Sequence, residues 1–463
     1  MKKLLFLFTL FFAYNIHAQE KSISIDSLLT LLHEQSQFNG NVLIIQKGEE
    51  ILKKSYGLAN RTTKKALNEN SIFELASLSK QFTAAGIILL HREGKLSYTD
   101  KLTKYFPELT FCKDVSIKNL LNHSSGIPEY FGLMMKYGDQ SKIANNKDVI
   151  QMLYNKVDSL DFYPSDQFNY SNTNYLLLAS IIEKIEKKSY SDFMKAAIFE
   201  PLGMENTFIY NRRYQPRSIP NYADGYVLGA RQKVSLPDSL EYYDYVTYLD
   251  GIVGDGMVNS TINDLRIWDQ SLRRHAFIQQ DELDCLQTLD TLNNGAVNTY
   301  SFGWNVKKKD HAINMSHSGS WPGYVTYISR DVHADNLIVI LQNFDEIVLP
   351  VKAIREVLND EPISTTYKKE IQLSNSVLKQ YTGTYLDGED PNDVTTLSLG
   401  QNALIFNSTN NPWDMPFYPD SENTFFSKAP RMNIGFEFVE EKGAMKLVFL
   451  QNGKKIGMSV KKE

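Results

Sequence analysis

The stretch Phe73-Glu-Leu-Ala-Ser-Leu-Ser-Lys-Gln-Phe82 carries Ser77 and Lys80 three residues apart. An apolar run over residues 83–90 follows and predicts a buried helix. If that helix begins near Ser77, the two side chains share one face, one turn apart. The hydroxyl then lies at a helix N-terminus, which favours negative charge, beside an amine that can accept its proton once it is desolvated. The stretch therefore predicts a nucleophilic serine with a neighbouring base.

Strand patterns stand at both ends of residues 20–360, and helical patterns lie between them. This order predicts one antiparallel sheet built from both ends of the segment, flanked by helices and carrying a helical insert, which is an α+β fold. The expected strands are 40–46, 50–56, 313–317, 324–329 and 337–342, and the expected helices are 24–35, 116–122, 146–156, 174–188, 260–271 and 350–358.

The character of the chain changes after residue 360. Residues 361–374 have mixed charge and predict a linker. Residues 375–463 hold several short strand patterns separated by polar turns, which predicts a small all-β domain, either a barrel or a sandwich. We therefore expect a main domain over 19–360 and a second domain over 375–463.

The N-terminus has the pattern of a secretory signal peptide. Lys2 and Lys3 precede an apolar run over 4–13, and a cut after Ala18 is expected. The run is short for a membrane span, and no other long apolar segment follows, so no stable span is expected. The sequence thus predicts export, with removal of residues 1–18, to the periplasm or the extracellular space.

Composition excludes several classes of function. Hydrophobic residues make up 42% and charged residues 22%, which is ordinary for a globular protein. The formal charge of −5 offers nothing that would attract nucleic acid. The histidines show no His-Glu-x-x-His pattern or close pair, so no metal is expected. Export permits a bond between Cys112 and Cys285, but two cysteines define no disulfide framework, and their pairing stays open.

Two further short motifs could serve a nucleophilic serine. Tyr170-Ser-Asn172 offers a tyrosine that becomes a base near two cations, and an amide that can bond an amine and a substrate carbonyl. Alone, it is more often a helix-entry turn with a buried tyrosine. His317-Ser-Gly319 precedes Ser320, and Gly319 would let a ligand backbone approach a strand. Alone, it is more often a strand histidine with a local hydrogen bond.

Taken in this order, Ser-x-x-Lys, Tyr-x-Asn and His-x-Gly resemble the signature of the serine β-lactamase and penicillin-binding protein superfamily. The chain resembles its class C branch most, which includes DD-peptidases, esterases and D-amino-acid peptidases. The resemblance covers about residues 24–358 and implies a β-lactamase/transpeptidase-like domain. Further stretches that look like family landmarks are Phe38-Asn-Gly-Asn-Val-Leu43, Gly94-Lys-Leu96, Leu120-Leu-Asn-His-Ser-Ser-Gly-Ile-Pro128, Pro201-Leu-Gly-Met204 and Gly254-Asp-Gly256.

The resemblance implies a role for each matching residue. Ser77 would be the acylated nucleophile, Lys80 its proton acceptor, and Tyr170 a second group in the proton transfer. Asn172 would orient Lys80 and the substrate. The backbone N–H groups of Ser77 and Ser320 would form the oxyanion hole.

One departure from the family pattern affects the substrate. His317 and Gly319 belong to a His-Ser-Gly triplet where many lactamases carry Lys-Thr-Gly. Lysine is a fixed cation for a substrate carboxylate, whereas histidine is mostly neutral at pH 7. This favours peptidase or esterase chemistry over efficient β-lactamase activity. His123 and Asp255 also fall in landmarks. We expect His123 to brace a loop. Asp255 could line the cleft, but a Gly-Asp-Gly loop more often forms a turn.

The sequence therefore predicts an exported serine hydrolase that forms an acyl-enzyme on Ser77. The substrate would be a small molecule or peptide with an amide, ester or β-lactam-like bond, such as a D-amino-acid peptide of the cell wall. No cofactor is expected, and the number of subunits is left open. The alternative is a catalytically slow or silent penicillin- or peptide-binding protein of the same fold, which the three intact motifs disfavour.

Overall fold

The computed structural model describes residues 2–228, 233–345, 348–365, 367–387, 390, 392–409, 414–428, 434–451 and 453–462, with the backbone alone for 2–17. The chain divides into two compact units. One consists of residues 40–225 and 237–343, and the other of residues 1–39, 226–236 and 344–463. The predicted domain boundaries at residues 360 and 375 are not tested by this division and stay predictions.

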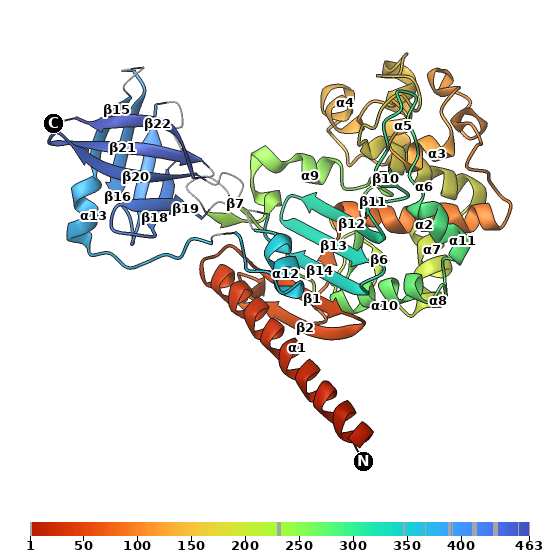
Figure 1. The fold of residues 1–463 in the computed structure, drawn as a ribbon. Helices are drawn as coiled ribbons and strands as arrows, with labels where there is room; N and C mark the ends of the chain where they lie inside the picture. Colours follow the sequence, from red (N-terminus) through yellow and green to blue (C-terminus); the bar gives the residue numbers. More distant parts are fainter. Residues whose placement is uncertain are drawn as a thin grey trace. The chain divides into compact units, whose positions relative to one another are not determined.

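The first unit contains a seven-stranded antiparallel sheet in the order β10-β11-β12-β13-β14-β1-β2 (Figure 1). The early strand β1 pairs with the late strand β14, with Val42 opposite Ile340. This confirms the expected sheet built from both ends of the segment. The strands are β1 (Gly40–Gln46), β2 (Glu49–Tyr56), β10 (Tyr300–Ser301), β11 (Trp304–Lys309), β12 (Ala312–Trp321), β13 (Tyr324–Asp331) and β14 (Asn336–Gln342).

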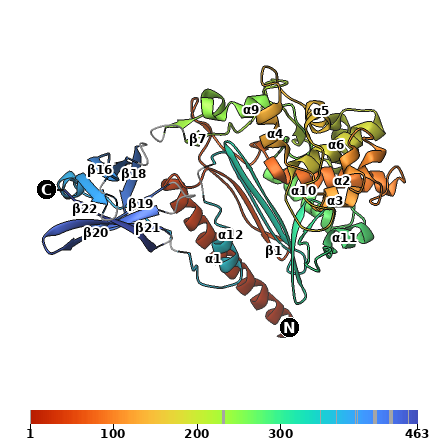
Figure 2. The same ribbon diagram turned by 90° about the horizontal axis from the view of Figure 1, so that it is seen from above.

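Helices of the same unit lie together on one side of this sheet, which Figure 2 shows nearly edge-on. Most expected helices are present within a few residues, although α4 was not anticipated. Their bounds are α2 (Ser79–Arg92), α3 (Ile117–Leu121), α4 (Tyr130–Tyr137), α5 (Asn146–Lys156), α6 (Asn172–Glu186) and α10 (Ile262–Arg273). Shorter elements around them include β5 (Phe73–Glu74) and β9 (Val258–Ser260), which pair with each other.

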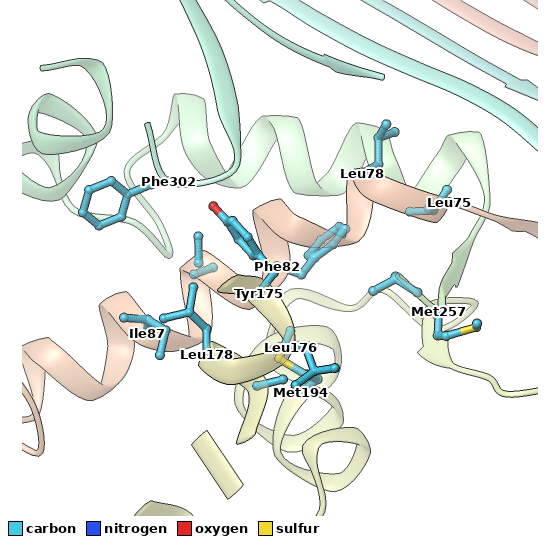
Figure 3. Close-up of a cluster of buried hydrophobic side chains, with 14 of the residues drawn as sticks. Leu75, Leu78, Phe82, Ile87, Tyr175, Leu176, Leu178, Met194, Met257 and Phe302 are labelled. Atoms are coloured by element: carbon cyan, nitrogen blue, oxygen red, sulfur yellow. The ribbon is translucent and has the colours of Figure 1, made fainter. Parts of the chain in front are cut away.

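The core of this unit forms where α2 crosses α6 beneath the sheet (Figure 3). Phe82, Ile87 and Tyr175 have no exposed surface. Burying each such side chain contributes about 1.5–3 kcal/mol. The first turn of α2 is therefore anchored by packing, which fixes the position of the residues just before it.

Ser77 lies outside α2. It belongs to a short 3₁₀ helix, Ala76–Leu78, that leads into the α-helix. The expectation of one helix beginning near Ser77 is thus corrected by two residues. Ala76 has a φ of 50°, a left-handed conformation that an L-residue adopts at a cost of about 1–2 kcal/mol. This turn changes the direction of the chain between β5 and α2.

The second unit contains α1 (Lys2–Glu34) and α12 (Val351–Leu358). Lys21 joins them, because its Nζ donates to the carbonyl of Leu358 at 2.7 Å. Residues 1–17 of the predicted signal peptide lie outside the described side chains, and Met1 lies outside the described backbone too. Within the described part of the chain, none of the helices combines the length and apolar character that crossing a bilayer requires.

The C-terminal part of the second unit is a closed eight-stranded barrel, which confirms the expected small all-β region. Aromatic side chains fill it: Tyr385, Phe425 and Phe436 are fully buried. Two strands were missed, one interrupted by prolines and one rich in lysine. Helix α13 (Asn375–Tyr381) precedes β15 (Gly383–Asp387), β16 (Val394–Leu399), β17 (Leu404–Ser408), β18 (Met415–Pro419), β19 (Thr424–Ser427), β20 (Ile434–Glu441), β21 (Ala444–Gln451) and β22 (Lys454–Lys461).

The two cysteines are free thiols. Cys112 is fully buried, and burial raises the pKa of its thiol to about 12. Cys285 is partly exposed. Burial also raises the pKa of the Cys285 thiol, so neither cysteine readily forms the nucleophilic thiolate.

Candidate active site

Lys80 is fully buried and makes three hydrogen bonds. Its Nζ donates to Ser77 Oγ at 3.1 Å, to Asn172 Oδ1 at 2.8 Å and to the backbone carbonyl of Asp255 at 2.8 Å. An ammonium group has three donors, so this arrangement satisfies all of them inside the protein. Ser77 is partly exposed. The structure thus joins a solvent-facing hydroxyl to a buried amine.

The turn that carries Ser77 is held from the sheet side. Thr326 Oγ1 donates to the carbonyl of Leu75 at 2.7 Å, and the N–H of Leu75 donates to Val258 O at 2.8 Å. Gly319 lies directly against this turn, because a Cβ added there would come within 2.3 Å of Leu75 O. We expected Gly319 to admit a ligand backbone. In the structure it admits the backbone of the turn before Ser77.

Tyr170 and Asn172 lie at the start of α6, in a loop held by His123. The N–H of Ser171 donates to His123 Nδ1 at 3.2 Å, and Asn174 Nδ2 lies 3.2 Å from the same nitrogen. Burial, followed by the nearby Lys80 charge, holds the pKa of His123 well below its ordinary value. The imidazole is therefore neutral and can accept both bonds, which confirms the expected bracing role of His123.

The Tyr170 hydroxyl is buried and has no hydrogen-bond partner among the described residues. Its ring faces Lys80, whose Nζ lies 5.0 Å from the ring centroid. The rings of His123 and Tyr300 lie at centroid distances of 4.3 Å and 5.9 Å. A buried hydroxyl without a partner carries a free-energy cost, which a substrate atom could relieve.

Both ring nitrogens of His317 are engaged by the protein. Nδ1 lies 2.7 Å from the carbonyl of Ser318, and Nε2 lies 3.0 Å from the Tyr300 hydroxyl. A carbonyl only accepts, so Nδ1 carries the hydrogen and Nε2 accepts. Burial, and then the charge of Lys80, lowers the pKa of His317 to about 3. A tyrosine near two cations can act as a base, but the structure leaves His317 uncharged at neutral pH and so does not supply a cation from that side of Tyr170.

A pocket of about 150 Å³ opens at Ser77. Two expected substrate-binding residues, Asn172 and Ser320, line it with the nucleophile, whereas Tyr170, His317 and Gly319 do not. Its lining also includes Trp321 and the residues 255–257. The full lining is Glu74, Ala76, Ser77, Tyr130, Phe131, Asn172, Leu249, Ile252, Asp255, Gly256, Met257, Ser320 and Trp321.

Three carboxyl groups near the pocket were not recognised as site residues from the sequence. Glu129 accepts the backbone N–H of Asn172 at 2.5 Å and its Nδ2 at 3.3 Å. Asp255 accepts the Tyr130 hydroxyl at 3.0 Å. Glu74 lines the pocket at 4% exposure. Asp255 stands in a quoted family stretch, Glu129 directly follows one and Glu74 lies shortly before the Ser-x-x-Lys motif, but nothing in the sequence indicates which acid turns inward.

Burial shifts the protonation of these carboxyl groups. It raises the pKa of Glu129 and of Asp255, and it raises the pKa of Glu74 to about 7. Among the described side chains that line the pocket, none is Lys, Arg or His. Across the described part of the chain, no group of His, Cys, Asp and Glu has the arrangement of a metal site. The pocket surface is therefore polar and acidic.

Known proteins resemble this chain over most of its length. Penicillin-binding protein 4* of Bacillus subtilis is 38% identical over 449 residues, which cover 94% of this chain and 98% of that protein. An octameric penicillin-binding protein homologue from Pyrococcus abyssi matches the fold with a TM-score of 0.63 at 21% identity, over 94% of this chain and 98% of that one.

D-amino acid amidase from Ochrobactrum anthropi SV3 matches the fold with a TM-score of 0.57 at 23% identity, over 71% of this chain and 92% of that one. The family model described as Beta-lactamase matches residues 25–357, which contain the seven-stranded sheet, the helices packed on it from α2 to α10, and every residue of the candidate site. This assignment supports serine-hydrolase chemistry in general. By this match and by its likeness to a penicillin-binding protein over nearly its whole length, the chain belongs to the Beta-lactamase family.

Proposed function

We propose that the protein is an exported serine hydrolase that cleaves an amide or ester through an acyl-enzyme on Ser77. The observation that carries this proposal is the 3.1 Å contact between Ser77 Oγ and Lys80 Nζ beside a pocket. A hydroxyl is a poor nucleophile until a base takes its proton, and a desolvated amine within hydrogen-bond reach can do so.

The proposed reaction starts from the form of the site in which the Lys80 amine is unprotonated. Ser77 Oγ forms a bond to the substrate carbonyl carbon while its proton moves to that amine. The carbonyl oxygen becomes an oxyanion, and the backbone N–H groups of Ser77 and Ser320 stabilise it. Collapse breaks the bond to the leaving nitrogen or oxygen, which takes up a proton delivered through Tyr170. Water then attacks the acyl group by the reverse proton path and frees Ser77.

The charge of the pocket narrows the substrate class. Glu74 and Asp255 are acidic, no described basic side chain lines the pocket, and His317 is neutral. A substrate carboxylate would lack a cation partner there. Peptidase, amidase or esterase activity on a leaving group without a carboxylate therefore fits better than efficient β-lactamase activity. A D-amino-acid amide has suitable chemistry, because its leaving group carries no carboxylate, and one structural neighbour is a D-amino acid amidase.

The N-terminal pattern supports export to the periplasm or the extracellular space. Lys2 and Lys3, the apolar run over 4–13 and the small residue Ala18 follow the order of a signal peptide. Mass spectrometry of protein recovered outside the cytoplasm should find Gln19 at the N-terminus. Recovery of the intact chain beginning at Met1 would contradict this part of the proposal.

The hydrolase proposal is tested by three substrates assayed side by side: a nitrophenyl ester, a chromogenic cephalosporin and a D-alanyl dipeptide. We expect turnover of the ester above that of the cephalosporin, and loss of both in Ser77→Ala. A second candidate, a slow or silent binding protein, is favoured only by the name of the Bacillus subtilis relative. Stable retention of labelled penicillin on folded protein without turnover of any substrate would support that candidate instead.

A further inference from the structure

The segment that precedes α4 is tied to the start of α6. The Thr173 hydroxyl donates to the carbonyl of Pro128 at 2.7 Å and accepts the N–H of Tyr130 at 2.8 Å. Thr173 has no exposed surface, so these bonds are shielded from water. Glu129 lies between the two tied residues. Its backbone is therefore fixed relative to Asn172, the first residue of α6.

The Glu129 carboxylate caps α6 from outside the helix. Ser171 holds the N-cap position, but its side chain makes no capping bond and its Oγ is buried without a described partner. Glu129 instead accepts the N–H of Asn172 at 2.5 Å. A carboxylate at this end is favoured both by the unpaired N–H groups and by the helix dipole. The cap thus comes from a residue 43 positions earlier in the chain.

The same carboxylate sets the orientation of the Asn172 side chain. Nδ2 donates to Glu129 Oε1 at 3.3 Å, which leaves Oδ1 facing Lys80 Nζ at 2.8 Å. The reversed amide would place an oxygen against the carboxylate and an N–H against the ammonium, which are two repulsive contacts. Glu129 therefore selects the one amide orientation that can accept from Lys80.

Tyr130, the next residue, reaches the other acceptor of Lys80. Its hydroxyl donates to Asp255 Oδ2 at 3.0 Å, and the backbone carbonyl of Asp255 accepts from Lys80 at 2.8 Å. Asp255 lies in a tight loop, because the preceding Gly254 has a φ of 105° and a Cβ there would lie 2.5 Å from Tyr175 O. Two consecutive residues thus hold the two groups that, with Ser77, surround the amine.

We propose that Glu129 and Tyr130 are positioning residues for Lys80, the first acting through Asn172 and the second through Asp255. The inference rests on the proposed hydrolase function, since it concerns the group that takes the Ser77 proton. Neither residue needs to touch the reacting atoms. Their effect is to keep Nζ within reach of Oγ, and a displacement of about 1 Å in such a contact can cost on the order of a hundredfold in rate.

The charges around Lys80 make the proposal sensitive to pH. The Glu129 carboxyl group is linked to Lys80 through Asn172, the Asp255 carboxyl group interacts with Lys80 through its charge, and the Tyr170 ring lies beside the amine. His123 and His317 are uncharged near neutral pH, because burial lowers the pKa of both imidazoles. The hydroxyls of Tyr130, Tyr175 and Tyr300 stay protonated, because burial raises their pKa values. Removing the Glu129 charge would therefore take one negative group away from the surroundings of the reacting groups.

Glu129→Gln tests the first half of the proposal. A glutamine cannot accept from both N–H groups of Asn172, so the amide loses its fixed orientation. We expect kcat for the ester substrate to fall about tenfold to a hundredfold with KM within about threefold, and the acid limb of the pH profile to move to lower pH. Glu129→Asp, which keeps the charge, should recover part of kcat. Tyr130→Phe should lower kcat by a smaller factor, about threefold to tenfold.

Two matched variants serve as controls. Glu282 also accepts a backbone N–H at a helix start, from Gln279 at 2.8 Å, but lies outside the pocket lining. Tyr248 is a buried tyrosine that donates to Met134 O at 3.4 Å, and it too lies outside the lining. We expect Glu282→Gln and Tyr248→Phe to leave kcat within twofold and the pH limb unchanged, whatever they do to the melting temperature.

A fluorophosphonate probe measures the reactivity of Ser77 without substrate turnover. The labelling rate is followed from pH 5 to 9. A wild-type protein that takes no label would overturn the proposed function. A wild type that is labelled, together with a Glu129→Gln variant labelled at the same rate and with the same pH dependence, would overturn only the positioning role. The positioning role would also be overturned if Glu129→Gln and Glu129→Asp lost kcat equally, with lowered melting temperatures and an unchanged acid limb of the pH profile. Glu129 would then contribute to stability alone.

Discussion

The two flanks of Lys80 differ in how their polar groups are satisfied. On one flank, Asn172 Oδ1 and Asp255 O each accept from Nζ at 2.8 Å, and both are held in turn by a neighbouring carboxyl or hydroxyl group. On the other flank, the Tyr170 hydroxyl has no described partner and His317 is neutral. The first flank fixes the position of the Lys80 amine, and the second leaves the Tyr170 hydroxyl free beside it. Proton transfer in the proposed reaction needs both the fixed amine and the free hydroxyl.

Removing the amine should have the largest effect, because both flanks then lose their shared partner. We expect Lys80→Met to lower kcat/KM for the ester substrate by at least about 10⁴-fold, as loss of a general base at a covalent nucleophile does. Steady-state kinetics measures this, with circular dichroism to verify folding. Activity within tenfold of wild type in a folded variant would remove Lys80 from the reaction.

Tyr170→Phe tests the free flank and should have the second largest effect. We expect a loss of about 10²–10⁴ in kcat, the range for a general acid–base group, with no loss of stability because the hydroxyl makes no bond. Tyr300→Phe is the matched control. Its hydroxyl bonds His317 at 3.0 Å, so it should cost stability and little rate. A loss below about threefold in Tyr170→Phe would reject an acid–base role.

Gly319→Ala tests whether the sheet sets the position of Ser77. The added Cβ would meet Leu75 O at 2.3 Å, which must displace the turn. We expect kcat to fall about a hundredfold together with a lower melting temperature. Gly256→Ala is the control from the same pocket, because a Cβ there meets nothing within 4 Å. Equal behaviour of the two variants would show that the close contact at Gly319 is unimportant.

Glu74→Gln should change the dependence of stability on pH. Burial raises the pKa of Glu74 from 4.5 to about 7, so the folded protein keeps a proton that the unfolded chain has already lost. The protonated Glu74 therefore makes its full contribution to the free energy of unfolding below pH 4.5. As pH rises from 4.5 through 7 this contribution is lost, and the free energy of unfolding falls by at most roughly 3 kcal/mol. Urea unfolding at pH 5 and pH 8 should show a smaller decline in Glu74→Gln. The exposed Glu205→Gln should match wild type, and an unchanged slope in Glu74→Gln would contradict the burial effect.

The smallest effect is expected for His317→Gln. Because both ring nitrogens bond the protein and the pKa of the imidazole is about 3, His317 should not titrate between pH 5 and 8. We expect less than about a tenfold loss in kcat/KM and an unchanged shape of the pH profile over that range. Disappearance of a limb of the profile in this variant would show that His317 does exchange protons with the reaction.

The sequence predicted the fold of the protein better than the detailed geometry of its candidate active site. The apolar runs of residues 40–46 and 337–342 predicted strands that do pair, since a strand buried on both faces leaves a short continuous apolar run in the sequence. The pattern could not place Ala76 in a left-handed turn, because that turn packs against the backbone of β12, a contact that only the folded chain makes.

The environment of His317 shows why the rest could not be predicted. The sequence indicated that a histidine replaces a fixed cation, and the structure adds that burial and Lys80 keep it neutral. Glu129 has no periodic or motif signal at all. Its role follows from a contact across 43 residues, which only the folded chain brings together. The protonation state of a buried histidine and a contact between residues far apart in the sequence both depend on tertiary packing.

Peptide mass spectrometry of protein quenched within seconds of mixing with the nitrophenyl ester tests the central claim most directly. We expect an acyl group on the peptide that contains Ser77 in the wild type, and none in Ser77→Ala or Lys80→Met. An acyl group on another residue, or equal acylation of Ser77→Ala, would contradict an activated serine at this position.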